Sequence, residues 1–573
     1  MKSIIPFVLL CLIATTMWSW REQGDPQRTY LQQSLNKPIT MCGSVSLGWS
    51  DSTRLPPPQI LAGLGTDHFP ITTSSAKAQQ FFDQGLRLVY AFNHWEAIRA
   101  FNEAIRLDPD CAMAYWGLAL AFGPNLNDTN PMDRERTALE AIQQAKTKSN
   151  HITMTEKDAI DALAVRYDGK AYAARDSLNN AYAKAMKKLA NRYPNHPNIQ
   201  ALCADAIMNT MPWNYWQRDG LPKHETKIAK LILENLIKKF PDHSGAHHLY
   251  IHLVEASRTP EIALASAKFL ETSMPGAGHI VHMPAHIYIR TGMYTKSIEA
   301  NKQAVSVDEQ YLSYSDNQGA YRLMYYPHNI DFIAYSAYMG GQSGLGISTA
   351  LKLAYKGSFS KISTPAFSQY LTVEPMIAFL RFGKWNEILA LPDPGREILY
   401  AQVMWRFSRG MALIRSGYTK EAKSELMKLD SLNALDTLKS LYISFNPVST
   451  SSEISTNLLR GEILLKEKNW NEAISIFKSA VEKEDLMQYN EPPDWKIPTR
   501  HYLGAALLEA GQFLEAEKVY KDDLKVNRDN GWSISGLHQS YLKQNKKADA
   551  AFTEKRLGKA WKNADIVVAN SRF

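Results

Sequence analysis

Histidine is concentrated in one part of the chain. Eight of the fifteen histidines lie between His243 and His328. The stretch "GHIVHMPAHIYIRTGMYTKSIEAN", residues 278–301, holds three of them at spacings of three and four residues. Such spacings place side chains on one face of an α-helix. Adding the stretches "HLYIHLVE" and "HNID" gives the candidate set His248, His252, Glu255, His279, His282, His286, His328 and Asp331.

A group of neighbouring imidazoles indicates divalent-metal binding. Close imidazoles repel one another when protonated, whereas neutral ring nitrogens can share a cation. Histidine with carboxylate does not select sharply among metals, so zinc, copper, iron, nickel and manganese all fit the set. Glu255 and Asp331 would either bind the ion or hold a ligating histidine by its second nitrogen. The alternative is a polar, hydrogen-bonded groove for a peptide or a small anion.

No reaction follows from these residues. The sequence has no HExxH, GxSxG or P-loop motif and no cysteine–histidine pair of the catalytic kind. Whether the protein is an enzyme, and which residues would be catalytic, is therefore left open. His243 and His247 are expected to be ordinary hydrogen-bonded residues.

The elements that carry the histidines follow a repeat. Gly85 is followed at offsets of 12, 16, 19 and 24 residues by Ala97, Phe101, Ala104 and Pro109. The offsets recur after Gly461, Gly504 and Gly536, and more weakly after Gly410. This pattern predicts two amphipathic helices per unit, with small residues at the close crossing and an aromatic beside them. One unit cannot bury its apolar face alone, so stacked units, an all-α solenoid, are expected.

This pattern resembles the tetratricopeptide repeat family, whose unit has about 34 residues. In that family, positions 2, 5, 9 and 12 of the first helix line a concave groove. The resemblance implies that the histidines of three consecutive first helices face one groove, and that an extended peptide or protein is the partner. In the unit of residues 278–301, Ser297 takes a small-residue position and Asn301 the aromatic one. The blocks "GHIVHMPAHIYIRTG" and "YYPHN" further resemble exported bacterial members with a histidine-rich middle, for which no activity is implied.

Pro284 conflicts with this phasing. A proline inside a helix removes a backbone donor and collides with the carbonyl four residues earlier. If a helix instead starts at Pro284, His279 and His282 belong to a preceding turn and their place in the groove is weaker. On this basis the sequence favours His248, His252, His286 and His328 over that pair.

The remaining segments suggest an exported protein. Residues 1–21 read as a signal peptide or N-terminal anchor, which favours a periplasmic or secreted location, with membrane contact only if the segment is uncleaved. The predicted order continues with a linker (22–70), an N-terminal repeat pair (71–150), a central histidine-bearing region (151–360), further repeat-like helices (361–445) and C-terminal repeats (446–573). Four cysteines are too few for a disulfide scaffold.

The charge of the chain excludes one class of partner. Its net charge of +8 arises from 65 Lys and Arg against 57 Asp and Glu, scattered in short pairs. A nucleic-acid-binding protein would gather its basic residues on one face, so no nucleic-acid partner is expected.

Overall fold

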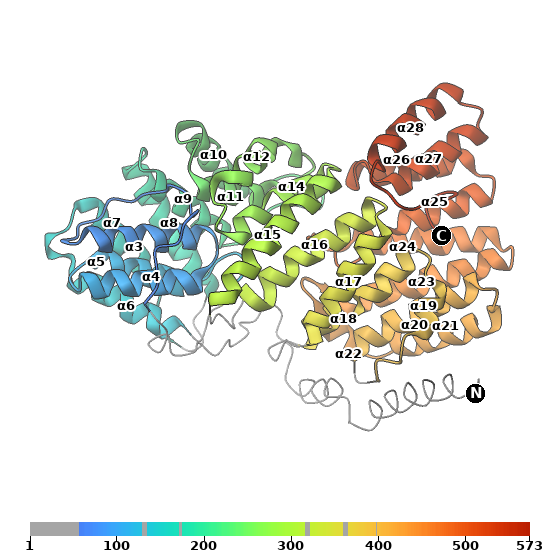
Figure 1. Ribbon diagram of the computed structural model, residues 1–573, viewed down its shortest axis with the longest axis horizontal. Helices are drawn as coiled ribbons and strands as arrows, with labels where there is room; N and C mark the ends of the chain where they lie inside the picture. The colour runs from blue at the N-terminus through green and yellow to red at the C-terminus, as the bar shows by residue number, and fades with distance from the viewer. Residues whose placement is uncertain (1–56, 129–133, 171–174, 316–320, 359–364, 397) are drawn as a thin grey trace, which may run out of the picture. The chain divides into compact units, whose positions relative to one another are not determined.

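The computed structural model describes residues 57–573 except 129–133, 171–174, 316–320, 359–364 and 397. The described residues divide into two compact units, one from 57–349 with 489–573 and one from 350–488. The predicted all-α fold is confirmed, since helices follow one another along both units (Figure 1). Within the described residues, the only paired strands are the two-residue β1 (Tyr442–Ile443) and β2 (Asn446–Pro447). The predicted signal peptide, and with it the expected location, lies outside the described residues.

The first unit holds the predicted N-terminal, central and last C-terminal helices. Its helices are α3 (Ala76–Tyr90), α4 (His94–Leu107), α5 (Ala112–Phe122), α6 (Glu135–Thr147), α7 (Met154–Ala164), α8 (Arg175–Arg192), α9 (Pro197–Met208), α10 (His224–Lys239), α11 (Ser244–Val254), α12 (Leu264–Ser273), α13 (Gly278–His282), α14 (Pro284–Arg290), α15 (Tyr294–Tyr314), α16 (Tyr326–Met339), α25 (Thr499–Glu509), α26 (Phe513–Val526), α27 (Gly531–Lys543) and α28 (Lys547–Ala560). Short 3-10 turns lie at η2 (Ser149–His151) and η3 (Pro260–Ala263), and a π-helical turn at η4 (Tyr321–Tyr325).

The second unit is a shorter series of helix pairs. Its elements are α18 (Pro365–Arg381), α19 (Trp385–Ala390), α20 (Leu399–Arg415), α21 (Thr419–Asn433), α22 (Thr437–Ser440), β1, β2, α23 (Val448–Lys466) and α24 (Trp470–Asp485). The division between the units falls inside α17 (Ser343–Ser358). Neighbouring helices such as α20 and α21, or α23 and α24, pack in pairs.

The repeat offsets correspond to a specific contact between paired helices. Gly85 of α3 and Gly117 of α5 both face the ring of Phe101 on α4, which is fully buried. In the second unit, Gly461 on α23 faces the ring of Phe477 on α24 in the same way. A small residue is needed at each crossing because the aromatic ring occupies the space that a side chain would fill.

The crossing of α25, α26 and α27 gives a measurable prediction. A Cβ atom on Gly536 would lie 2.1 Å from the ring of Tyr520. We expect Gly536→Ala to lower the free energy of unfolding by about 1–3 kcal/mol, because overpacking outweighs the higher helix propensity of alanine. Gly558→Ala on α28 is the matched control, since nothing lies within 4 Å of its Cβ position. This control should be neutral or stabilising in chemical denaturation, and equal destabilisation of both variants would contradict the packing explanation.

The predicted segment boundaries need two corrections. Residues 489–573 were expected to continue the block that begins at residue 446, yet they cluster with the central region. Trp532 on α27 donates its indole N–H to the carbonyl of Tyr338 at 2.8 Å, which ties α27 to α16. The predicted linker also ends earlier than residue 70, because Phe69 is buried and its backbone N–H donates to Asp83 at 3.1 Å. Both differences arise from long-range contacts.

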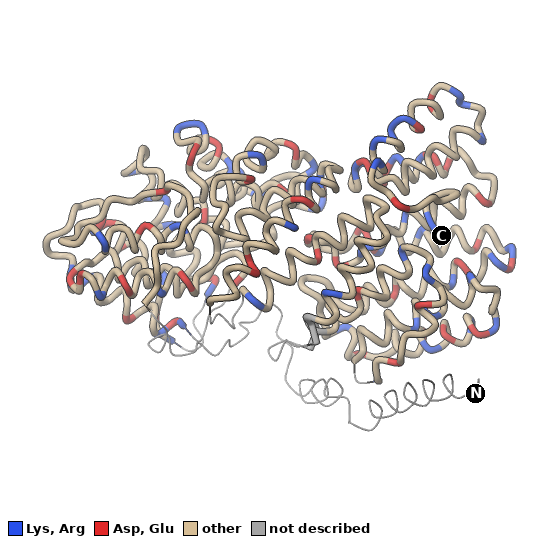
Figure 2. The backbone as a smooth tube through the Cα atoms, in the orientation of Figure 1, with Lys and Arg blue, Asp and Glu red and all other residues tan. Residues whose placement is uncertain are grey.

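Charge, cysteine and length complete the description. Basic and acidic residues are interspersed along the helices (Figure 2). Cys111 and Cys203 are buried free thiols, whereas Cys11 and Cys42 lie outside the described residues. Across the part of the chain that the structure describes, no helix is both long and apolar enough to span a bilayer.

Candidate metal centre

Four helices of the first unit bring six histidines together. Helix α11 carries His248 and His252, with Glu255 as its C-terminal cap; α13 carries His279 and His282, α14 carries His286, and α16 carries His328. Their nitrogen atoms and nearby carboxylates form three groups, each with ligand atoms within 4.8 Å of one another. The first group is His248, His252 and His279; the second is His282, His286 and His328; the third is Glu255, His286 and Glu491.

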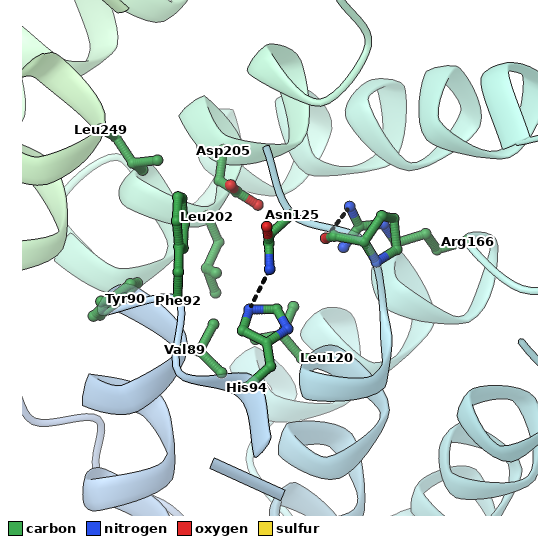
Figure 3. Close-up of a pocket in the computed structure, with 11 residues that line it drawn as sticks. Val89, Tyr90, Phe92, His94, Leu120, Asn125, Arg166, Leu202, Asp205 and Leu249 are labelled. Carbon is green, nitrogen blue, oxygen red and sulfur yellow. Dashed lines mark hydrogen bonds between the residues drawn. The ribbon is translucent and has the colours of Figure 1, made fainter. Parts of the chain in front are cut away.

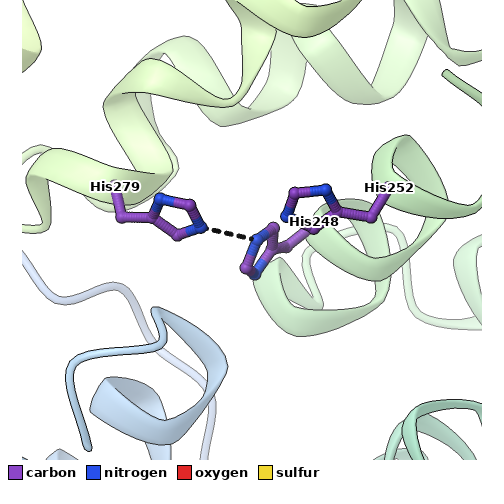
Figure 4. A group of neighbouring side chains, drawn as sticks. All are labelled: His248, His252 and His279. Atoms are coloured by element: carbon purple, nitrogen blue, oxygen red, sulfur yellow. Dashed lines mark hydrogen bonds between the residues drawn. The ribbon is translucent and has the colours of Figure 1, made fainter. Parts of the chain in front are cut away.

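In the first group, the rings of His248 and His279 lie close together, with His252 beside them (Figure 4). The Nδ1 atom of His248 lies 2.6 Å from the carbonyl oxygen of Tyr90, which only accepts hydrogen bonds, so Nδ1 carries the proton and Nε2 is bare. His252 Nδ1 likewise faces the Glu255 carboxylate at 3.1 Å, and its buried Nε2 has no hydrogen-bond partner. His279 Nε2 lies 3.2 Å from His248 Nε2. The group therefore presents lone pairs to one small volume.

The second group holds two ring nitrogens at close range. His282 Nδ1 donates to Asn301 Oδ1 at 2.6 Å, and the amide of Asn301 is oriented by its own donation to the Ser297 carbonyl at 2.8 Å. His282 Nε2 is therefore an acceptor. It lies 2.8 Å from His286 Nε2, whose ring also contacts Glu491 Oε2 through Nδ1 at 3.0 Å. Two nitrogens at that distance share either a proton or a metal ion.

The spacing of these nitrogens resembles one edge of a metal coordination sphere. Ligands bound at about 2.0–2.1 Å and separated by about 90–110° lie roughly 2.9–3.4 Å from one another. The Nε2···Nε2 distances are 2.8 Å in the second group and 3.2 Å in the first. One pair of ligand atoms in each group therefore already has the spacing of a shared ion, and the third lies within 4.8 Å of both.

Burial keeps the imidazoles in the form that binds metals. It lowers the pKa of His252 and His328 to about 3 and that of His286 to about 4. Burial, followed by neighbouring imidazoles, also holds the pKa of each remaining histidine of the two groups well below its usual value. Neutral rings carry one lone pair each, which is the form that a metal ion binds at neutral pH.

Two buried carboxyls adjoin the histidines. Glu255 Oε2 lies 2.5 Å from His286 Nδ1 without hydrogen-bonding geometry, while Glu491 Oε2 makes the hydrogen bond to that same nitrogen. Burial raises the pKa of both carboxyls; the adjacent Glu255 raises that of Glu491 further, and His286 opposes the shift at Glu255. Carboxylates in this position orient ligating imidazoles and increase their basicity.

Glu491 and Lys496 are site residues that sequence reasoning missed. Both belong to the Pro-rich segment "NEPPDWKIP" before α25, which the sequence identifies only as an insertion between repeats. Lys496 is fully buried and pairs with the carboxylate of Asp331 on α16. Asp331, a predicted ligand, is in none of the three groups. The sequence does show charged residues in this insertion between regular repeats. The spacing does not show that they are buried or which helix their side chains contact.

The structure answers the question raised by Pro284. A helix does begin there, with Pro284 as the first residue of α14 and a short α13 before it. The consequence expected for His279 and His282 was wrong, because both side chains join the groups.

The expected open groove is also incorrect at this position. Five of the six histidines are 2% exposed or less, and only His328 is partly exposed. Phe92, in the turn between α3 and α4, lies over the first group with its ring centroid 4.5 Å from that of His248. Glu491, which is 205 residues from His286 in the sequence, contacts that histidine of the second group. His243 and His247 stay outside the groups: His243 caps α11, and His247 bonds to Ser266 at 2.8 Å.

Phe92 also lines a small cavity. It has a volume of about 20 Å³, enough for about one water molecule, and Phe92, His94, Asn125, Arg166 and Asp205 are among its lining residues (Figure 3). Asn125 Nδ2 lies 3.4 Å from His94 Nε2. Burial lowers the pKa of His94 to about 3 and raises that of Asp205 to about 6. A cavity of this size holds solvent and excludes an organic substrate.

Comparison with protein-family models and with curated proteins gives no match. Among solved structures, the chain is similar to the human IFIT1 dimer with m7Gppp-AAAA, with a TM-score of 0.34, 12% identity, and coverage of 85% of this chain and 95% of that one. It is also similar to the APC/C hetero-tetramer Cut9-Hcn1, with a TM-score of 0.29, 13% identity, and coverage of 85% and 74%. At these TM-scores the likeness carries no argument about function.

Proposed function

We propose that this helical-repeat protein binds a divalent transition-metal ion through the buried histidines of α11, α13, α14 and α16. The observation that carries the proposal is the pair of Nε2 atoms of His282 and His286, whose separation of 2.8 Å suits two ligands of one ion. The acceptor at Nδ1 of His282 leaves its Nε2 atom as a lone pair. His328 completes the group, with all three ligand atoms within 4.8 Å of one another.

The donor set narrows the choice of metal. Each histidine group offers three imidazoles and no carboxylate. Imidazole suits zinc, copper, iron and nickel, whereas manganese prefers oxygen ligands. Three histidines also leave a coordination position for water, as in catalytic zinc sites. We assign no reaction to the site.

Metal analysis tests the proposal directly. Purified protein, dialysed against metal-free buffer, should retain zinc, copper, iron or nickel in elemental analysis. Replacing His282 and His286 with alanine should abolish metal binding by the second group, because two of its three imidazole ligands are lost. His247→Ala is the matched control: His247 is also buried on α11, but both of its ring nitrogens bond to protein atoms, at 2.8 and 2.9 Å. Folded wild-type protein that holds no metal after incubation with each ion would refute the proposal.

The other expectations from the sequence stay proposals. The buried histidines offer no surface to an extended peptide, so a peptide or protein partner would use other faces of the repeats. The resemblance to exported bacterial proteins with a histidine-rich middle implies export through residues 1–21. Fractionation of cells that express the full chain tests this, and recovery of the intact protein from the cytoplasm alone would contradict it.

A further inference from the structure

The first histidine group has features that the proposed single ion does not explain. The Nε2 atoms of His282 and His286 account for one ion in the second group. In the first group, the Tyr90 carbonyl accepts from Nδ1 of His248, which leaves its Nε2 atom as a lone pair. His252 Nδ1 contacts Glu255, and its buried Nε2 atom has no hydrogen-bond partner. A buried polar nitrogen of this kind is costly unless a ligand satisfies it.

The two groups have no shared member. His248, His252 and His279 form one set of ligand atoms, and His282, His286 and His328 form the other. They lie next to each other, with ring centroids 5.4 Å apart for His252 and His286 and 5.8 Å for His279 and His282. Six imidazoles in two sets of three are more than one tetrahedral ion uses.

Glu255 connects the two sets. Its Oε1 atom accepts from Nδ1 of His252, a member of the first group, at 3.1 Å. Its Oε2 atom lies 2.5 Å from Nδ1 of His286, a member of the second group. Glu491 contacts only the second of these histidines. One buried carboxylate therefore positions a ligand in each group.

Resting on the proposed metal-binding function, we infer that the protein holds two adjacent divalent transition-metal ions, one per histidine group, and that Glu255 positions one ligand of each. The first ion is bound by His248, His252 and His279, and the second by His282, His286 and His328. Each keeps a position for water. The negative charge of Glu255 between the groups offsets part of the repulsion between the two ions.

Ion counting tests the two-ion arrangement. Native mass spectrometry of the full chain loaded with Zn²⁺ should show two ions. His248→Ala with His279→Ala should leave one ion, His282→Ala with His328→Ala should leave one ion, and the His247→Ala control should keep two. One ion in wild type would overturn the two-ion inference while leaving the proposed function intact. No ion in wild type would refute both.

A measurement on the unmodified chain covers the case in which a variant does not fold. Wild-type protein loaded with Cu²⁺ should give an electron paramagnetic resonance spectrum broadened or weakened by coupling between neighbouring ions. A spectrum of isolated ions at full loading would overturn the adjacency of the two sites.

The role of Glu255 has its own matched pair of variants. Glu255→Ala should weaken Zn²⁺ binding about 10- to 100-fold in both groups, because a positioning contact is lost in each. Glu491→Ala removes another buried carboxylate, which among the six histidines contacts His286 alone, so it should weaken the second group alone. Calorimetric titration of each variant, alone and with one histidine group removed, separates the two affinities. An unchanged affinity of the first group in Glu255→Ala would refute the connecting role.

Discussion

Removing the bound metal with a chelator is expected to lower the free energy of unfolding of the histidine-bearing unit by about 4 kcal/mol per ion, if the free ion had exceeded Kd about 1000-fold. The folded chain holds the imidazoles together, whereas the unfolded chain does not, so the binding free energy adds to the free energy of folding. Without the ion, the Nε2 atoms of His282 and His286 again face each other at 2.8 Å.

The loss should be local, and hydrogen exchange can show where it occurs. Helices α11, α13, α14 and α16 should lose protection on chelation, while residues 350–488 should keep theirs, because none of the candidate ligands lies in that unit. The variant without His282 and His286 serves as the control and should respond less to the chelator. Identical exchange of the wild-type protein with and without chelator would contradict the prediction.

Much of the fold could be predicted because the repeat makes local contacts. Gly85 and Phe101 are sixteen residues apart and meet across one helix pair, so their spacing is visible in the sequence. The histidines within one helix were found for the same reason, since spacings of three and four share a face. The contacts that join the helices into one site are made by residues far apart in the sequence. The repeat offsets do not predict them.

The parts of the site that escaped prediction come from long-range contacts. Glu491 is 205 residues from the histidine that it contacts, and the Tyr90 carbonyl is 158 residues from His248. A backbone acceptor has no sequence signature of its own. Asn301 was an available clue: it replaces the aromatic of the repeat on α15, and its amide oxygen accepts from His282 at 2.6 Å. A polar residue in a core position indicates that a neighbouring polar group needs a partner.

Asp331 shows why residue type alone misplaces a ligand. The sequence puts it three residues after His328 on one helix face, where a carboxylate would suit a metal. In the structure the fully buried ammonium of Lys496 pairs with it instead. The partner comes from an insertion without periodicity, so the pairing could not be read from the repeat.

Replacing Lys496 with methionine is expected to lower the free energy of unfolding by about 3–5 kcal/mol. Methionine fills similar volume but removes the ammonium beside Asp331, which is 2% exposed. Removing one partner of a buried ion pair costs this much because the other charge stays buried. Lys428→Met is the matched surface control: Lys428 is half-exposed and pairs with Glu425 on α21, so its loss should cost less than about 1 kcal/mol.

The double variant separates charge balance from packing. Lys496→Met combined with Asp331→Asn removes both charges and should recover most of the stability lost in the single variant, because no buried carboxylate remains. Chemical denaturation of the three proteins, with Zn²⁺ in excess throughout, gives the coupling free energy. If the double variant is as unstable as Lys496→Met, the unpaired carboxylate of Asp331 is not the cause of the loss, and the prediction is wrong.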